Sequence, residues 1–177
     1  MNEERFYSPS DFVSELNLTF GTYVADFGSG AGNFAVEMAR HVGREGRIFA
    51  FDIRTPALQS LQSKARSAGY RNIKPVRSDL EEERGTGLPD EYVDLVLIHN
   101  IIFQVKDKKS LLQEAARVTK PGGRVAAVEW EKSSPIGPRM KDRMSKSELT
   151  DLFEKHGLAH EADLKAGAYH YGVSFHK

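Results

Sequence analysis

Hydrophobic positions follow two alternating patterns along the chain. Short, almost continuous apolar runs lie at residues 23–27, 47–52, 93–98 and 124–128. Runs of this length and composition are typical of buried strands in a parallel sheet. Between these runs apolar residues recur every three or four positions, as Phe34, Met38 and Val42 do, which indicates helices with one buried face. The pattern therefore predicts strands and helices in alternation.

This alternation favours an α/β fold with a parallel sheet and right-handed crossovers. A further strand at 72–77 contains Pro75, which cannot donate a hydrogen bond to a neighbouring strand, so we expect it at a sheet edge. The tail at 158–177 has two candidate strands with no helix between them, which predicts an antiparallel hairpin at the end of the sheet. We expect one domain over residues 1–177, with a short N-terminal arm at 1–22 and a lid-like loop at 131–146.

Composition narrows the classes of function. The chain has 177 residues, no cysteine and a net charge of zero. The lack of cysteine excludes disulfides, thiolate zinc sites and cysteine nucleophiles, and we expect no metal centre. The neutral charge balance does not indicate nucleic acid as a partner. The charged start has no apolar segment behind it, and the longest apolar stretch, 93–105, is too short and polar to span a bilayer. We therefore expect a cytoplasmic protein.

A glycine-rich turn follows the first strand, with the letters VADFGSGAGNF at residues 24–34. Gly28, Gly30 and Gly32 allow the backbone to turn sharply and to approach a ligand closely. The free amide groups at the start of the next helix would point at that ligand. A dinucleotide motif of the form G-x-G-x-x-G would need glycine at position 33, where this chain has Asn33. The turn suits a nucleotide or the charged tail of an amino acid.

Polar residues also stand where the next three strands end. Asp52 lies 20 residues beyond Gly32, where a carboxylate can accept hydrogen bonds from both ribose hydroxyls. Asp79 and Leu80 follow the third strand, where a carboxylate beside an amide can read an adenine ring. His99 ends the fourth strand. Ligands of open α/β sheets bind outside the carboxyl ends of the strands, so these residues are expected to share one site.

Together the motifs resemble the Rossmann-like S-adenosylmethionine-dependent methyltransferases, and most of all their small type-11 and ubiquinone-menaquinone-biosynthesis-like members. The similarity is carried by VADFGSGAGNF, IFAFDI, RSDLEE, DLVLIHNIIFQV and ARVTKPGGRVAAVEW, which lie between residues 24 and 130. It implies a three-layer, doubly wound, mostly parallel seven-stranded sheet in the order 3-2-1-4-5-7-6, with the last strand antiparallel. It also implies that S-adenosylmethionine is the cofactor and S-adenosylhomocysteine the product.

The resemblance implies roles for individual residues. The cofactor-binding positions would be Asp26, Gly28, Ser29, Gly30, Phe34, Asp52, Ile53, Asp79, Leu80 and His99. It also makes His99 and Asn100 candidates for catalysis, and His170 is a third candidate because the expected last strand would bring it near His99. One departure lies at residues 100–103, where the letters NIIF keep only the ends of the N-P-P-F motif of adenine and glutamine amide methyltransferases, so that chemistry is not assigned.

Methyl transfer from a sulfonium is an in-line displacement, for which a protein supplies proximity, alignment and a dry site. A general base is needed only if the acceptor has a proton to lose. An antiparallel last strand starts at the edge where the parallel strands end, which brings its first residues toward the site. We expect an acceptor pocket formed by Tyr7, Phe103, Trp130, Tyr169 and Tyr171.

The residues leave three alternatives open. The chain is either a methyltransferase acting on a small molecule or a protein side chain, a non-catalytic module that binds the cofactor or a partner, or an NAD-dependent oxidoreductase. Asn33 argues against the last of these, because it replaces a glycine of the dinucleotide motif. The acceptor and the oligomeric state, a homodimer included, are not fixed by the sequence.

Overall fold

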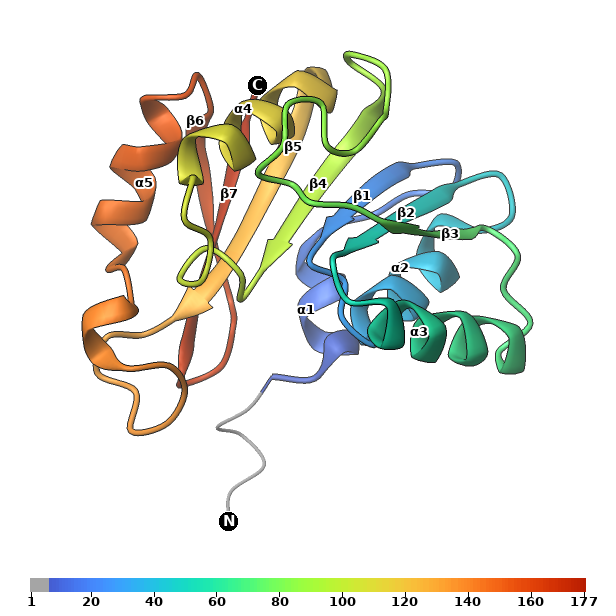
Figure 1. Cartoon of the computed structure of the whole chain (residues 1–177), viewed down its shortest axis with the longest axis horizontal. Coiled ribbons are helices and arrows are strands. Elements are labelled where there is room, and N and C mark those ends of the chain that lie inside the picture. The colour runs from blue at the N-terminus through green and yellow to red at the C-terminus, as the bar shows by residue number, and fades with distance from the viewer. Residues whose placement is uncertain (1–6) are drawn as a thin grey trace.

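The computed structural model describes residues 7–177, which form a seven-stranded sheet with helices on both faces (Figure 1). The strands are β1 (Tyr23–Phe27), β2 (Arg47–Asp52), β3 (Ile73–Arg77), β4 (Val93–His99), β5 (Thr119–Trp130), β6 (Ala159–Leu164) and β7 (His170–His176). The helices are α1 (Pro9–Glu15), α2 (Asn33–Val42), α3 (Thr55–Ser67), α4 (Lys108–Val118) and α5 (Lys146–Glu154). The sheet order is β3-β2-β1-β4-β5-β7-β6, which confirms the predicted fold.

Strand β1 lies at the centre of the parallel part of the sheet, between β2 and β4. The last strand, β7, runs antiparallel to both β5 and β6, which confirms the predicted hairpin. Strand β3 is an edge strand, as Pro75 predicted. Ile48 and Ser78 donate backbone hydrogen bonds across the β2–β3 pair, to Asn72 and Asp52. The backbone N–H groups of successive residues in a strand point to opposite sides. The nitrogen of Pro75 therefore lies on the side of β3 that faces away from β2, where an added strand would need a hydrogen-bond donor.

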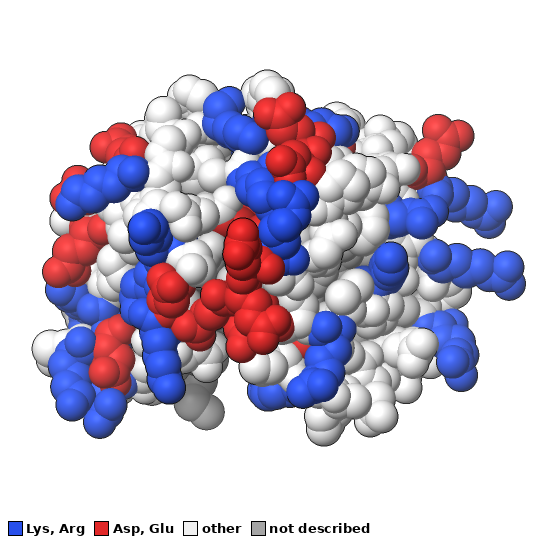
Figure 2. Space-filling model, turned by 45° about the horizontal axis from the view of Figure 1, so that its top comes forward, with Lys and Arg blue, Asp and Glu red and all other residues white. Residues whose placement is uncertain are grey.

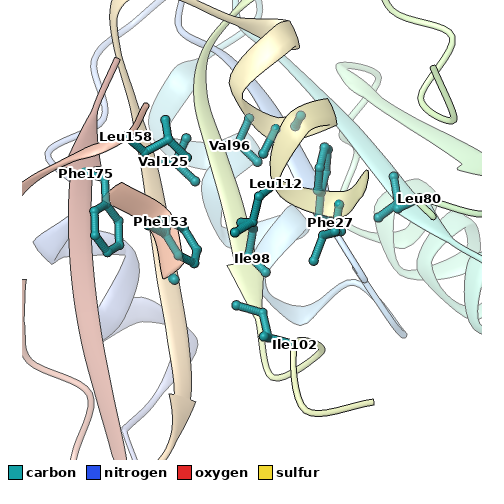
Figure 3. Close-up of a cluster of buried hydrophobic side chains, with 14 of the residues drawn as sticks. Phe27, Leu80, Val96, Ile98, Ile102, Leu112, Val125, Phe153, Leu158 and Phe175 are labelled. Carbon is teal, nitrogen blue, oxygen red and sulfur yellow. The ribbon is translucent and has the colours of Figure 1, made fainter. Parts of the chain in front are cut away.

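Two hydrophobic cores cover the two faces of the sheet. Alternate residues of β1 belong to different cores: Phe27 packs toward α4 and α5, and Val24 packs toward α1, α2 and α3. Figure 3 shows the first core, where side chains of β4 and β5 meet α4 and α5. At the end of this core Phe153 stacks on Phe175, with ring centroids 4.3 Å apart, and so fixes α5 against β7.

Three helix starts carry the caps that short polar side chains provide. Ser8 accepts from the amide of Asp11 at the start of α1, and Asp107 accepts from the amide of Ser110 at the start of α4. Ser145 and Glu148 form a capping box at the start of α5. Among residues 7–177 no helix combines the length and the apolar character needed to cross a membrane.

Candidate active site

The glycine turn connects β1 to α2 with three residues in the left-handed region, at φ 76° for Gly28, 54° for Gly30 and 80° for Gly32. Gly28 lies directly against Ile101 and Gly32 against Leu61, so neither position has room for a side chain. Gly30 has open space around it apart from the end of the Arg54 side chain. The two outer glycines therefore allow close packing, and the middle one exposes backbone to a ligand.

The start of α2 offers free polar groups to such a ligand. Gly32 occupies the N-cap position, where it provides no side-chain acceptor for the first amides of the helix. Asp26 and Ser29 are buried beside the turn, and Oδ2 of Asp26 and Oγ of Ser29 have no hydrogen-bond partner among the described residues. Burial, together with the nearby charge of Asp52, raises the pKa of Asp26 to about 7. Unpaired buried polar atoms of this kind fit a site completed by a polar ligand.

Asp52, at the end of β2, has a crowded carboxylate. Oδ2 accepts from the amide of Gly30 at 2.9 Å, and Oδ1 accepts from the amide of Arg54 at 2.8 Å. The Arg54 guanidinium also donates to each oxygen at 3.2 Å. Burial opposes ionisation of Asp52, but the hydrogen bonds from Arg54 and Gly30 outweigh it and lower the pKa of this carboxyl. Sequence reasoning did not identify Arg54, although a cation two residues after a buried aspartate is a readable signal.

These strand ends enclose a cavity of about 380 Å³. Its lining includes predicted cofactor positions from all four strand ends, namely Gly28, Asp52, Ile53, Asp79, Leu80 and His99. The remaining lining residues are Arg54, Ser78, Glu81, Asn100, Ile101, Gln104, Val105 and Leu111. Ile53 is 55% exposed, which is unusual for an isoleucine and gives the mouth an apolar surface for a flat ring.

Beyond the glycine turn, His99 joins the cavity to a cluster of rings. Its Nε2 is hydrogen-bonded to the hydroxyl of Tyr7, across 92 residues of sequence. Phe34 also packs on this imidazole, with its ring centroid 4.2 Å from that of His99 and 6.1 Å from that of Tyr7. Burial, followed by the proximity of His170, lowers the pKa of His99 to about 3, so its imidazole is neutral at physiological pH.

His170 lies at the centre of the same cluster. Its Nε2 is 3.0 Å from Nδ2 of Asn100, and its ring is 4.0 Å from that of Trp130 and 5.2 Å from that of Tyr7. Asn100 holds its position through a left-handed backbone conformation, with φ at 53°. Nδ1 of His170 and Oδ1 of Asn100 are buried without a partner among residues 7–177. Burial lowers the pKa of His170 to about 4.

The structure brings Tyr7, His99, Asn100, Trp130 and His170 together, but not all of the predicted aromatic residues. Tyr171 faces the opposite side of the sheet from His170, where its hydroxyl donates to the carbonyl of Met144 at 3.0 Å. Tyr169 and Phe103 are half-buried at the ends of β7 and β4, and the carbonyl of Tyr169 accepts from the amide of Glu131 at 2.9 Å.

Glu129, which the sequence reasoning also missed, is buried below the cluster at the end of β5. One carboxylate oxygen accepts from the amide of Ile102 at 2.7 Å and so holds the chain that follows Asn100. Burial raises the pKa of Glu129 to about 7 despite the hydrogen bonds from backbone amides. Its signal was a single acidic residue in an otherwise apolar strand.

The predicted lid-like loop is wrapped around Arg143. The guanidinium donates to the carbonyls of Ser134 at 2.6 Å, Pro138 at 2.8 Å and Ile136 at 2.9 Å, and it also reaches two carbonyls at the start of the loop. Gly137 lies flat on Trp130, where an added Cβ would approach the indole to 2.6 Å. The loop therefore covers part of the Trp130 ring.

Comparison with known proteins identifies the class. A family model described as a methyltransferase domain matches residues 18–165, so the chain belongs to that family. The structure superimposes on a SAM-dependent methyltransferase from Aquifex aeolicus with a TM-score of 0.87 and 26% identity, covering 97% of this chain and 90% of the other. The chain is thus a member of the S-adenosylmethionine-dependent methyltransferases, as the motifs indicated.

Relatives of known function are similar over part of their length. The chain is 34% identical over 113 residues to the ubiquinone/menaquinone biosynthesis C-methyltransferase UbiE of Vibrio vulnificus, which covers 63% of this chain and 42% of that protein. It is 33% identical over 127 residues to UbiE of Francisella tularensis subsp. novicida, which covers 71% and 49%. The matched region spans less than half the length of these curated relatives.

Proposed function

We propose that the chain transfers the methyl group of S-adenosylmethionine, bound across the carboxyl ends of β1 to β4, to an acceptor held against Trp130 and His170. The observation that carries this proposal is the 380 Å³ cavity, which is lined by Gly28 of the glycine turn and by the ends of β2, β3 and β4. His99 belongs both to this cavity and to the ring cluster, and so connects the two parts of the site.

The residues present fit the cofactor. Asp52 would hold the ribose hydroxyls, with Ile53 and the Asp79–Leu80 segment around the adenine ring. The amides at the start of α2 would bind the carboxylate of the methionine part, because a helix N-terminus favours an anion. Asp26, beside the turn, has an unpaired carboxylate oxygen that would accept a hydrogen bond from the ammonium group of the same methionine part. When bound, S-adenosylmethionine supplies an already activated methyl group.

The two imidazoles on the acceptor side of the site are uncharged near neutral pH. His99 and His170, with their pKa values lowered to about 3 and about 4, are neutral there and accept a proton only weakly. Trp130, Tyr7 and the two imidazoles instead offer flat faces and hydrogen-bonding atoms that orient an acceptor. This arrangement favours an acceptor atom that is nucleophilic without strong base assistance.

The test uses methyl-labelled S-adenosylmethionine with the purified protein and a lysate of its source cells. Products are separated into protein, nucleic acid, lipid and small-molecule fractions. Isothermal titration with S-adenosylhomocysteine is run in parallel on the wild type, on Asp52→Ala and on the matched control Asp151→Ala, an exposed residue of α5. We expect tight binding by the wild type and the control, and a loss of at least about tenfold for Asp52→Ala, because the buried carboxylate offers charge-assisted hydrogen bonds.

Each result has a definite meaning. Label in one fraction that appears with the wild type and disappears with Asp52→Ala supports methyl transfer and identifies the acceptor class. Unchanged S-adenosylhomocysteine affinity in Asp52→Ala would refute the placement of the ribose. Tight binding of S-adenosylhomocysteine with no label in any fraction would indicate a non-catalytic module that binds the cofactor, and not an enzyme.

A further inference from the structure

Charge is divided unevenly along the chain, although its sum is zero. Residues 40–77 carry nine Lys or Arg and two Asp or Glu, a net charge of +7, and the rest of the chain carries −7. This segment contains β2, α3 and β3, which form one end of the sheet. Figure 2 shows basic side chains projecting from the right-hand edge of the molecule, the side on which Figure 1 places α3 and β3. The net charge of zero for the whole chain does not reveal this separation.

The basic edge is hollowed. A depression of about 600 Å³ is lined by Arg40, Arg44, Arg47 and Arg71, with Tyr70 and Asn72 among its other residues. A second one, of about 410 Å³, is lined by Arg66 and Arg71 and again by Tyr70. Since Tyr70 and Arg71 line both, the two depressions are neighbours with a half-buried aromatic ring between them.

Most of these guanidinium groups are not used by the fold. Arg40 pairs with Glu37, but the side chains of Arg44, Arg47, Arg66 and Arg71 are exposed and make no hydrogen bond or ion pair within residues 7–177. They are also not needed as helix caps.

The carbonyls at the end of α2 are already satisfied by other groups. Nδ2 of Asn72 donates to Ala39 and Gly43, and the amide of Gly21 donates to Val42. Free guanidinium groups that converge on a hollow are therefore available to an anionic ligand.

An exposed aromatic side chain stands at the rim of the larger depression. Phe20 is 86% exposed, the highest value among the large apolar side chains of the described part of the chain. Its ring lies against Gly43, which lines the depression and has φ at 68°, so that no side chain intervenes. A phenylalanine this exposed adds nothing to the core, whereas beside arginines it offers a stacking surface.

We propose that this basic face, defined as Phe20, Arg44, Arg47, Tyr70 and Arg71 with Arg40 and Arg66 at its ends, binds single-stranded nucleic acid. The guanidinium forks would contact successive phosphates, and the rings of Phe20 and Tyr70 would stack on bases. The face lies at the amino ends of β2 and β3, whereas the cofactor cavity lies at the carboxyl ends, so the inference goes beyond the proposed methyl transfer.

Three features favour nucleic acid over other anionic partners. Arginine predominates over lysine, and its planar fork matches a phosphate in a way that a point charge does not. Two aromatic rings flank the same depression, which an acidic peptide does not require. The surface is concave and presents one exposed large apolar side chain, whereas a protein that lies on a membrane needs a broader apolar face.

The experiment measures fluorescence anisotropy of labelled 20-nucleotide oligouridine and oligothymidine, at several salt concentrations, with the full chain. The charge-reversal variant Arg44→Glu/Arg47→Glu/Arg71→Glu is compared with Lys109→Glu/Lys141→Glu/Lys155→Glu, which makes the same change in net charge at exposed positions elsewhere. Phe20→Ser tests stacking at a position outside the hydrophobic core. S-adenosylhomocysteine binding is measured for every variant as an independent check of folding and of the cofactor site.

We expect the logarithm of the association constant to fall linearly with the logarithm of the salt concentration. The slope should be about −0.7 for each phosphate contacted. The Arg44/Arg47/Arg71 variant should lose more than about tenfold in affinity beyond any loss in the lysine variant. Phe20→Ser should lose affinity with an unchanged salt slope, because it removes stacking and no charge. All variants should retain S-adenosylhomocysteine binding.

Several outcomes would overturn the proposal. Absence of binding at low salt, or equal losses in the arginine and lysine variants, would show that no specific face exists. Tighter binding of polyglutamate than of either oligonucleotide would indicate an acidic protein as the partner, and preferential binding to vesicles containing phosphatidylserine would indicate a membrane. Self-association that the arginine variant abolishes would assign the face to the acidic surface of a second copy. None of these results bears on methyl transfer, which has its own test.

Discussion

At the scale of single residues, Asp52 is the position where the structure adds most to the sequence. An ionised carboxylate has about four lone-pair sites. Here two are used by the amides of Gly30 and Arg54 and two by the Arg54 guanidinium. Ribose hydroxyls that bind this carboxylate must therefore take the place of the guanidinium, whose side chain is 68% exposed and free to move away.

We predict that Arg54→Ala strengthens cofactor binding. The guanidinium competes with the ribose for the same oxygens, and removing it should increase the affinity for S-adenosylhomocysteine by about fivefold, the equivalent of roughly 1 kcal/mol for one exchanged hydrogen bond. Isothermal titration checks this, with Arg66→Ala as the control, because Arg66 is exposed near the end of α3 and its side chain has no partner within residues 7–177. Weaker binding by Arg54→Ala would mean that the guanidinium contacts the cofactor directly.

Asp26 is predicted to make stability depend on pH. Its pKa is about 7 in the fold, against an ordinary value of 3.8, so the folded protein keeps a proton that the unfolded chain has lost. The stabilising contribution is complete below about pH 4 and is lost as the pH rises through 7. Relative to wild type, Asp26→Asn should therefore gain in melting temperature between pH 5 and pH 8, measured without cofactor. A constant difference, like that expected for Asp151→Asn on the surface, would contradict the raised pKa.

The sequence predicted which residues share the site where they follow the ends of parallel strands. It did not predict contacts between side chains that are far apart in the sequence. Gly28, Asp52, Asp79 and His99 lie around one cavity because parallel strands end at one edge. Their binding roles stay predictions. Contacts between Tyr7 and His99, 92 residues apart, have no local signal. Tyr171 is different: side chains alternate along a strand, so it could not share a face with its neighbour His170.

At the scale of elements, a buried ion pair attaches α4 to the segment before β4. Glu114 is 3% exposed and accepts from the amide and hydroxyl of Thr86, at 3.0 Å and 2.5 Å. The Arg117 guanidinium donates to both of its oxygens, at 2.8 Å and 2.7 Å. Arg117 also donates to Leu88 and Asp90, so one pair of side chains holds several turns of an otherwise irregular segment.

We predict that Glu114→Ala lowers the free energy of unfolding by about 3 kcal/mol, because it leaves a partly buried guanidinium and a buried amide without their acceptor. Urea denaturation followed by circular dichroism measures the loss. Glu154→Ala, an exposed residue at the end of α5, is the control and should cause no measurable change. A similarly small effect for Glu114→Ala would mean that water replaces the carboxylate and that the segment is held by its apolar contacts.

Element types were predictable because patterns are local, whereas some boundaries were not. Strand β5 was expected at 124–128 after the letters PGG, yet it begins at Thr119. The residues after Thr119 that were expected to form a turn belong to β5, because Thr119 already pairs with Val93 of β4. The register then shifts, so that Leu95 pairs with Arg124. Lys177 at the other end of the chain also bonds to Gly122 and Gly123 through its backbone. Such pairing depends on distant partners, which short-range patterns do not contain.

At the scale of the whole molecule, the sheet order gives the last strand a central part in stability. Strand β7 is the end of the chain in sequence, but it lies between β5 and β6 in the sheet. It contributes Val173 and Phe175 to the core that also contains α4 and α5, and His170 to the ring cluster. Strand β7 therefore completes the core on one face of the sheet and places His170 on the opposite face.

We predict that removal of residues 170–177 abolishes cooperative unfolding of the entire chain. The deletion leaves β6 without its one neighbouring strand in the described sheet and β5 with an open edge, and it uncovers Phe153, which stacks on Phe175 at 4.3 Å. Thermal denaturation followed by circular dichroism should then show no sharp transition, and S-adenosylhomocysteine should not bind. Removal of Lys177 alone, which takes away two backbone hydrogen bonds, is the control and should retain both properties. A truncated protein that melts cooperatively and binds S-adenosylhomocysteine would show that β1 to β5 are stable by themselves, and that the cofactor cavity does not depend on the strand that carries His170.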